Sequence, residues 1–249
     1  MHYRTIIISD VHVGTPDSQY EKLYAFLQEH TCDTLILNGD IIDEQHVFLF
    51  KRFKQRKKEY TDFLTYLVDK TNHRSTVFYL NGNHDTFRGG SLFPQNGKVI
   101  LCEDLIYPSG EHTYYICHGQ QLDRVKRNIA FLTPLSLLVS AVFYWINRQY
   151  NKLRLRLHLP YQSILGKLKQ IGKFVMVWDQ TKFEESIRKL LQEKKCDGFI
   201  CGHIHKPWKD NLWWYLYLNS WDRVEHCTAI VETESNVRDI VYLAKKTHK

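Results

Sequence analysis

Acidic and histidine side chains follow short apolar runs in this chain, and both residue types bind divalent metal ions. The apolar run at residues 35–37 ends at Asn38-Gly39 and is followed by Asp40 and Asp43. An apolar stretch this short, closed by a turn pair, is typical of a buried strand. A strand placed there delivers Asp40 to its carboxyl end. Carboxylate, imidazole and amide donors without thiolates suit Mn, Fe, Zn or Co, so the pattern predicts metal-dependent chemistry.

Four further strand-like runs end in the same kinds of residue. Residues 5–9 lead into Asp10-Val11-His12, residues 76–81 into Gly82-Asn83-His84-Asp85, residues 114–117 into His118-Gly119, and residues 199–201 into Gly202-His203-Ile204-His205. Each motif alone is as typical of a capped turn or a core histidine as of a ligand. In an open α/β sheet, ligands bind outside the carboxyl ends of the strands, so these five ends can converge on one site.

The order of these motifs resembles the calcineurin-like metallophosphoesterases. The resemblance covers residues 10–205 and rests on Asp-x-His, Gly-Asp-x-x-Asp, Gly-Asn-His-Asp, His-Gly and Gly-His-x-His. It implies an α/β fold, a four-layer α/β/β/α sandwich, and two divalent metal ions, with Mn as the first candidate and Fe, Zn or Co as alternatives. It also implies that one ion is held by Asp10, His12, Asp40 and His205. The second is then held by Asp40, Asn83, His118 and His203.

The chemistry of such a site is phosphoester hydrolysis. One carboxylate can bridge two ions about 3.5–4 Å apart, and a water between them loses a proton near neutral pH and attacks phosphorus in line. The resemblance implies that His84 contacts the phosphate or protonates the leaving group. It further implies that Asp85 orients the ring of His84.

Length and composition indicate a cytoplasmic protein with one large core. The chain has 249 residues and is 43% apolar, which is enough for a single domain over residues 1–249 with an insertion at 119–178. No apolar run reaches the roughly 18 residues typical of a membrane span, and the first residues lack a signal-peptide pattern. The six cysteines show no Cys-x-x-Cys pairing, so we expect reduced, buried thiols.

Periodicity predicts the remaining elements. Helices are expected at residues 19–30, 46–72 and 181–195, and strands at 98–102, 105–107, 212–218, 227–232 and 237–243. A turn is expected at 108–110, and alternation from residue 105 onward predicts an antiparallel meander. The basic run at 51–58 is either a solvated helix face or an anion-facing rim near the site.

The insertion at 119–178 carries the positive charge of the protein. It holds ten basic residues against one acidic residue, in a chain whose net charge is +7. We expect two or three helices there, with an apolar stretch at 131–146 followed by a basic tract at 148–156. That composition favours an element lying on anionic lipid, although a helical hairpin packed on the body, an acyl-chain cap or a dimer contact would also fit. A nucleic-acid partner is not expected, because no binding motif accompanies the charge.

A narrower similarity concerns the UDP-2,3-diacylglucosamine diphosphatase branch of the family. It rests on the basic insertion after His-Gly and on residues 154–161, 202–207 and 218–229. The best-known members have Gly-Asn-Arg-Asp where this chain has His84, and an acidic pair soon after His-Gly where this chain has Gln120-Gln121. The similarity implies cleavage of the pyrophosphate of a lipid-linked sugar nucleotide, giving the lipid monophosphate and UMP.

We expect the substrate of such an enzyme to be bound by arginines beside the site and in the insertion. The candidates are Arg88, Arg124, Arg127, Arg148 and Arg154. Location on the inner face of the cell membrane would fit such a substrate. The alternatives are a phosphatase or phosphodiesterase on a nucleotide or phosphoprotein, and a non-catalytic, membrane-associated scaffold.

Overall fold

The computed structural model describes most of the chain. The described residues are 1–15, 18–43, 61–63, 65–67, 69, 75–85, 99–122, 133–159, 162, 164, 180–203, 207–210, 215–218, 227–236 and 238–242. They fall into two compact units. Unit 1 comprises Met1–Gln120 and Lys189–Lys249, and unit 2 comprises Gln121–Arg188.

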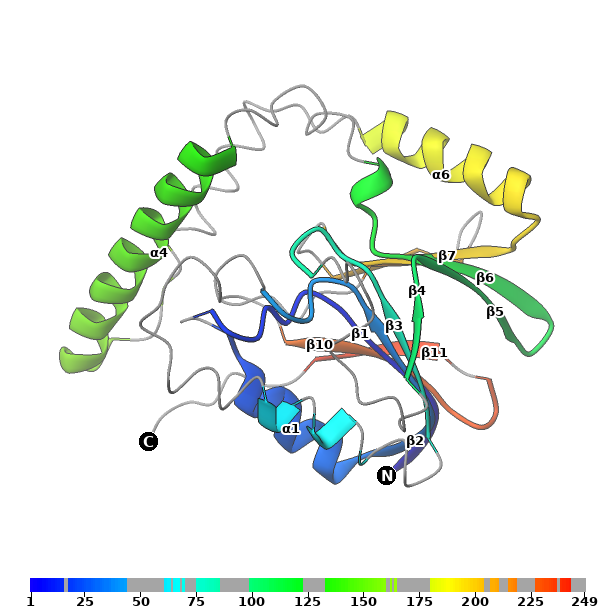
Figure 1. Ribbon diagram of the computed structural model, residues 1–249, viewed down its shortest axis with the longest axis horizontal. Coiled ribbons are helices and arrows are strands. Elements are labelled where there is room, and N and C mark those ends of the chain that lie inside the picture. Colours follow the sequence, from blue (N-terminus) through cyan, green and yellow to red (C-terminus); the bar gives the residue numbers. More distant parts are fainter. Residues whose placement is uncertain are drawn as a thin grey trace. The chain divides into compact units, whose positions relative to one another are not determined.

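The first sheet of unit 1 has six strands in the order β11-β10-β1-β2-β3-β4 (Figure 1). Its strands are β1 (His2–Ile8), β2 (Thr31–Asn38), β3 (Thr76–Leu80), β4 (Val99–Cys102), β10 (Thr228–Glu232) and β11 (Arg238–Tyr242). Strands β1 to β4 run parallel, and β10 pairs antiparallel with both β1 and β11. The parallel strands place their carboxyl ends at one edge, as the sequence predicted.

The second sheet has five strands in the order β5-β6-β7-β9-β8. They are β5 (Asp104–Ser109), β6 (His112–Cys117), β7 (Gly198–Cys201), β8 (Trp208–Asp210) and β9 (Tyr215–Leu218). The prediction of an antiparallel meander is wrong for most of this sheet. Only β5–β6 and β8–β9 are antiparallel, whereas β6, β7 and β9 run parallel. The long connection from β6 to β7 allows a crossover, which short turns would not. Strand β8 was missed.

The expected turn at 108–110 is shifted toward its end. Pro108 and Ser109 belong to β5 and pair with Thr113 and His112 of β6. Proline lacks a backbone N–H, so it is tolerated in β5 because β5 is the edge strand of its sheet. The chain therefore turns at Gly110, whose φ of 61° suits glycine.

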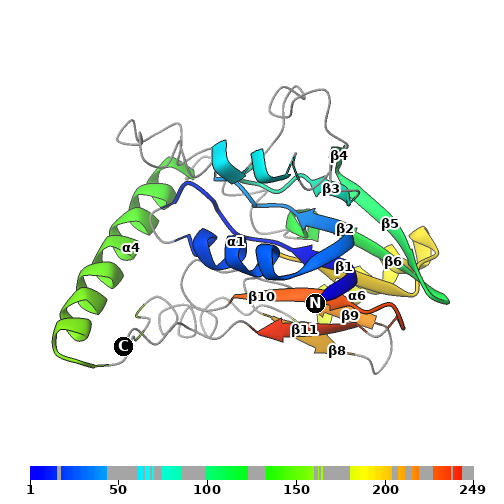
Figure 2. The same cartoon turned by 90° about the horizontal axis from the view of Figure 1, so that it is seen from below.

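The two sheets pack face to face, and α1 (Tyr20–Glu29) covers the outer face of the six-stranded sheet (Figure 2). Side chains alternate between the two faces. Ile6 and Leu35 pack with Leu23 and Phe26 of α1. Ile7, Ile36 and Leu80 instead pack with residues of the second sheet, which are Tyr114, Ile116 and Ile200.

The last turn of α6 (Gln180–Lys194) lies on the outer face of the second sheet. The Lys194 ammonium is 5.0 Å from the centroid of the Tyr115 ring and 3.6 Å from Asp104 Oδ2. The layers of unit 1 are therefore α1, the six-stranded sheet, the five-stranded sheet and the end of α6 from residue 189 onward, and the predicted α/β/β/α fold is confirmed. None of the six cysteines forms a disulfide, as expected, but only four are buried, since Cys102 and Cys196 are half-buried.

The main element of unit 2 is α4 (Thr133–Arg156), a helix of 24 residues. It contains most of the predicted apolar stretch and the whole basic tract, which the sequence had suggested as successive elements. The turn after it has the αL residue expected at a helix C-terminus, His158 with φ 54°, and Leu159 N–H donates to Arg154 O at 2.8 Å. Among the described helices, none is long and apolar enough to cross a membrane. Most of the predicted helix at 46–72, including the basic run at 51–58, lies outside the described residues.

Candidate metal centre

The chain turns sharply after three strands, at residues predicted to bind metal. Asp10, His12, Asp40 and His203 have φ of 58°, 49°, 52° and 64°. This left-handed region is uncommon for residues other than glycine, and its cost is typical of functional sites. Backbone hydrogen bonds hold the first two turns together, with Asp10 N–H donating to Gly39 O at 3.1 Å and His12 N–H to Asp40 O at 2.9 Å.

Two groups of side chains able to hold a metal ion lie at these turns. His12, Asp40 and His84 form one group, and Asp40, His118 and His203 form the other, with ligand atoms within 4.8 Å of one another in each. Asp40 belongs to both. Its Oδ2 lies 3.7 Å from His12 Nε2 and 3.3 Å from His118 Nε2, while its Oδ1 accepts the His84 N–H at 2.8 Å. Such a carboxylate is positioned to bridge two ions.

His118 presents one ring nitrogen to the site. Its Nδ1 lies 2.9 Å from Asn38 O, and since a carbonyl only accepts, Nδ1 carries the proton. The buried Nε2 has no hydrogen-bond partner among the described residues. Orienting a ligand histidine through the opposite nitrogen is common in metal sites. Together with the shared carboxylate, this orphaned nitrogen fits a divalent metal ion.

The charges at the site favour a cation. Burial raises the pKa of Asp40, but His118, His12 and His84 outweigh it and hold the pKa well below its ordinary value. Burial lowers the pKa of His118, yet the charge of Asp40 outweighs this and raises the pKa to about 9. The same carboxylate charge that raises the pKa of His118 would attract a metal ion.

The other predicted ligands are placed less completely. Asp10 is buried and in neither three-residue group, and its Oδ1 and Oδ2 accept the His203 N–H at 3.0 and 3.2 Å. Asn83 lies in the turn after β3, with its Oδ1 buried. His205 lies outside the described residues. The assignment of individual ligands to two ions stays a prediction.

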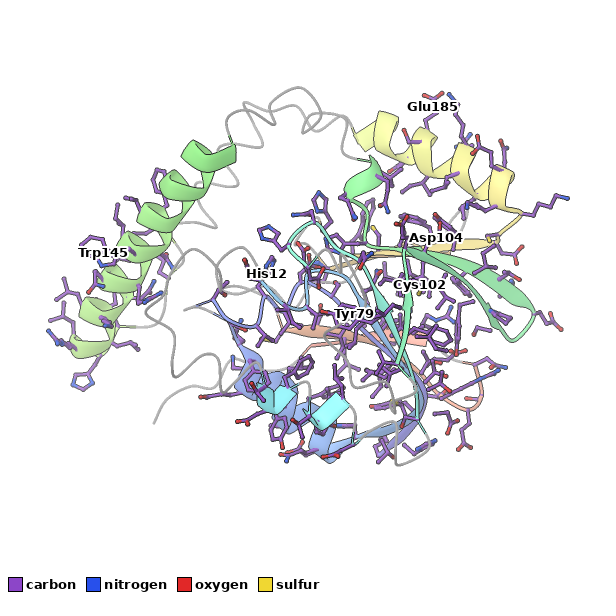
Figure 3. All side chains as sticks on the ribbon, viewed as in Figure 1. His12, Tyr79, Cys102, Asp104, Trp145 and Glu185 are labelled. Atoms are coloured by element: carbon purple, nitrogen blue, oxygen red, sulfur yellow. The ribbon has the colours of Figure 1, made fainter. Side chains whose placement is uncertain are left out.

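Asp43 was given no role from the sequence, but its carboxylate contacts the Nδ1 atoms of two histidines. Its fully buried Oδ2 lies 3.2 Å from His12 Nδ1 and 3.3 Å from His84 Nδ1. The two rings pack edge to face, with centroids 4.8 Å apart (Figure 3 labels His12). Both histidines can thus turn Nε2 away from Asp43. The second aspartate of the Gly-Asp-x-x-Asp motif was the available signal.

The predicted role of Asp85 is wrong in its detail, because its carboxylate binds backbone rather than the His84 ring. Oδ1 accepts from Asp40 N–H at 3.0 Å and Gly82 N–H at 2.7 Å. Oδ2 accepts from Ile41 N–H at 2.7 Å and from the Tyr79 hydroxyl at 2.9 Å. Burial and the charge of Asp40 raise the pKa of Asp85 to about 7, against these donors. Asp85 therefore positions the backbone that carries Asp40.

Two glycines leave room for the ligands. A Cβ on Gly39, whose φ is 76°, would lie 2.6 Å from the His118 ring. A Cβ on Gly82 would overlap Asp40 itself. The Asn-Gly and Gly-Asn turns of the sequence thus reflect close approach as well as turn conformation.

Two of the predicted substrate arginines lie on α4 in unit 2, and the other three lie outside the described residues. Arg148 and Arg154 are half-buried residues of α4, and the Arg154 guanidinium donates to the Tyr150 hydroxyl at 3.2 Å. Arg88, Arg124 and Arg127 lie outside the described residues. Their role in substrate binding stays a prediction.

The chain matches a known protein family. Residues 3–207 match the model of the calcineurin-like phosphoesterase family, and this range contains the candidate metal ligands described above.

Two curated relatives are similar to the chain. UDP-2,3-diacylglucosamine hydrolase of Wigglesworthia glossinidia brevipalpis is 22% identical over 212 residues, or 82% of this chain and 79% of the relative. The DNA polymerase II small subunit of Thermoplasma acidophilum is 25% identical over 234 residues, or 86% of this chain but 43% of the relative.

Solved structures give further similarities. An archaeal phosphodiesterase has 14% identity and a TM-score of 0.46, with 96% of this chain and 99% of that one covered. A Vps29 mutant from Entamoeba histolytica has 12% identity and a TM-score of 0.45, with the same coverage.

Proposed function

The chain belongs to the calcineurin-like phosphoesterase family and is a metal-dependent hydrolase, and on that premise we propose that it cleaves the pyrophosphate of a lipid-linked sugar nucleotide such as UDP-2,3-diacylglucosamine. The observation that carries the two-metal reaction is the Asp40 carboxylate, which is shared by two ligand groups. The substrate class is supported by the similarity to UDP-2,3-diacylglucosamine hydrolase and by the basic, partly apolar helix α4.

The proposed metal ligands are the residues predicted from the sequence. His12 and His118 would bind through Nε2, on either side of Asp40 Oδ2. Asp10, Asn83, His203 and His205 would complete the two coordination shells. The bound ions, with Mn as first candidate, supply Lewis acidity for the phosphoryl oxygens and lower the pKa of an attacking water.

His84 is proposed to give a proton to the leaving oxygen. Its side chain is 20% exposed, whereas those of His12 and His118 are almost fully buried, so it can reach substrate from the edge of the site. Asp43, whose Oδ2 lies 3.3 Å from His84 Nδ1, would orient the ring so that Nε2 can face the leaving group. His84 also stands within one of the ligand groups, so its variants should be scored for metal content as well as turnover.

The test is the variant Asp40→Asn, assayed with UDP-2,3-diacylglucosamine and with bis-p-nitrophenyl phosphate in the presence of Mn. We expect loss of bound metal and a fall in turnover of at least about 10³-fold on both substrates, because the bridging charge is removed. Asp33→Asn is the matched control, since Asp33 lies on β2, the strand that precedes Asp40, but is exposed. Normal turnover in the Asp40 variant would contradict the two-metal proposal.

A second candidate is phosphodiester hydrolysis of nucleic acid or nucleotides. It is favoured by the similarity to a DNA polymerase subunit and by the net charge of +7. The same assay separates the candidates when single-stranded DNA and a dinucleotide are added as substrates. Cleavage of the DNA, the dinucleotide and the small ester, without cleavage of the lipid substrate, would favour the second candidate. The proposed metal site would still hold.

A further inference from the structure

Helix α4 has one face that is covered within unit 2. Asn147 and Asn151, four residues apart, are buried and hold the chain that follows the helix. Asn151 Oδ1 accepts Gln162 N–H at 2.9 Å, and Asn147 Oδ1 accepts Ile164 N–H at 2.8 Å. These contacts show which side of α4 is covered by the rest of unit 2. The other side of the helix is not covered by these contacts.

The remaining surface of α4 exposes large apolar side chains in rows. Val142, Ile146 and Leu153 share one row, at spacings of four and seven residues that place them on the same side of a helix. Trp145 is 60% exposed and lies in the neighbouring row, which Figure 3 labels on the α4 ribbon. Soluble surfaces rarely expose so many apolar side chains together without a binding partner.

Positive charge accompanies this apolar surface. Lys152 and Arg156 are exposed and follow Trp145 by seven and eleven residues, so the three share a row. Arg148 precedes Lys152 by four residues. The whole helix, residues 133–156, contains no acidic residue. The face therefore combines apolar area, an indole and the exposed basic groups of Lys152 and Arg156, on a helix without acidic residues.

We propose that this face of α4, formed by Val142, Trp145, Ile146, Lys152, Leu153 and Arg156, binds the surface of an anionic lipid bilayer. Apolar side chains enter the boundary between headgroups and acyl chains, and the basic groups contact lipid phosphates. Indole rings favour that boundary because one edge is apolar and the other donates a hydrogen bond. Nucleic acid would use the charges but leave the apolar row in water. The contact is independent of hydrolysis, so it does not rest on the proposed reaction.

The experiment is vesicle co-sedimentation of the full-length chain, without metal or substrate. Binding is expected to vesicles of phosphatidylglycerol with phosphatidylcholine, to weaken in high salt, and to be much weaker for phosphatidylcholine alone. The variant Lys152→Gln with Arg156→Gln should bind about 30-fold more weakly, which corresponds to about 1 kcal/mol for each basic residue. The matched control is Arg188→Gln with Lys189→Gln, which removes the same two charges from exposed positions of α6.

Tryptophan fluorescence gives a second readout that does not depend on sedimentation. Anionic vesicles should shift the emission to the blue, and Trp145→Phe should lose most of that shift while Trp208→Phe keeps it. Equal binding to neutral vesicles, equal losses in the two charge variants, or a shift unchanged in Trp145→Phe would overturn the proposal. So would binding of duplex DNA in place of vesicles, or a dimer that Ile146→Ser dissociates and that binds no vesicles.

Discussion

The metal centre and α4 differ in whether their charged side chains are buried or exposed to solvent. At the metal centre, charged groups are buried and each contacts a specific neighbour, as Asp43 contacts His12 and His84 and as Asp85 contacts the backbone around Asp40. On α4, Lys152 and Arg156 are exposed beside exposed apolar side chains, with no acidic residue on the helix. Buried charges need exact partners because their desolvation is expensive, whereas exposed charges need only a field of opposite sign.

Because of this difference, the metal centre can position individual ions, whereas the face of α4 can only bind an extended surface. The residues at the strand ends could hold ions in a defined geometry because left-handed turns and backbone hydrogen bonds fix the backbone that carries them. The face of α4 defines no such geometry, and its rows suit an extended, laterally uniform partner. Changes in the first region should therefore alter turnover, stability or both, and changes in the second should alter binding alone.

Metal removal should give the largest effect. After chelation, we expect hydrolysis of bis-p-nitrophenyl phosphate to fall at least about 10³-fold and to return when Mn is added. Hydrogen exchange should slow on reloading at residues 9–13, 39–43 and 81–85 more than in α4, because α4 supplies none of the grouped ligands. Slower exchange mainly in α4 would contradict the assignment of the site.

A matched pair of isoleucines should give the next largest effect. Ile116→Ala, between the two sheets, should lower the free energy of unfolding by about 2–5 kcal/mol because it leaves a cavity. Ile146→Ala, at a side chain that is 40% exposed, should lower it by less than about 0.5 kcal/mol. Chemical denaturation of the two variants measures both values. A large loss for Ile146→Ala would mean that α4 is covered, which would remove the contrast between the regions.

Asp43 and Asp85, two of the buried aspartates, should give the smallest effect and the finest distinction. Asp43→Asn should lower turnover about 10- to 100-fold, because His12 and His84 lose the carboxylate that orients them, and should leave stability nearly unchanged. Asp85→Asn should instead destabilise the fold by about 2–4 kcal/mol, since its amide cannot accept from all the backbone donors now bound.

Measurements of turnover and of chemical denaturation for both variants test this distinction. A double variant of Asp43 and His84 then tests whether the two residues act through each other. Losses that add fully in the double variant would show that Asp43 and His84 act separately.

The positions of the ligand-bearing strands could be predicted because the signals are local. Short apolar runs ending in glycine and acidic or histidine residues specify strand and turn within a few residues, and β1, β2, β3, β6 and β7 all end near the predicted residues. The order of the motifs was enough to predict the family, which the match over residues 3–207 confirms.

Partners between distant segments could not be predicted in the same way. Asp43 and Asp85 both follow a ligand motif, and only the folded chain shows that Asp43 faces His12, 31 residues away, while Asp85 turns to the backbone of the neighbouring strand end. The parallel pairing of β6, β7 and β9 likewise depends on which strands a crossover brings together. Strand pairing and side-chain contacts are decided by long-range packing, which local periodicity does not encode.

For α4, the sequence determined composition and the tertiary structure decided orientation. An apolar stretch followed by basic residues was evident from the sequence alone, yet it suited a buried hairpin as well as a lipid surface. The contacts of Asn147 and Asn151 turn one side of the helix inward and leave Trp145, Lys152 and Arg156 together on another. The sequence determines which residues α4 contains, but only the contacts within unit 2 decide which of them are buried and which are exposed.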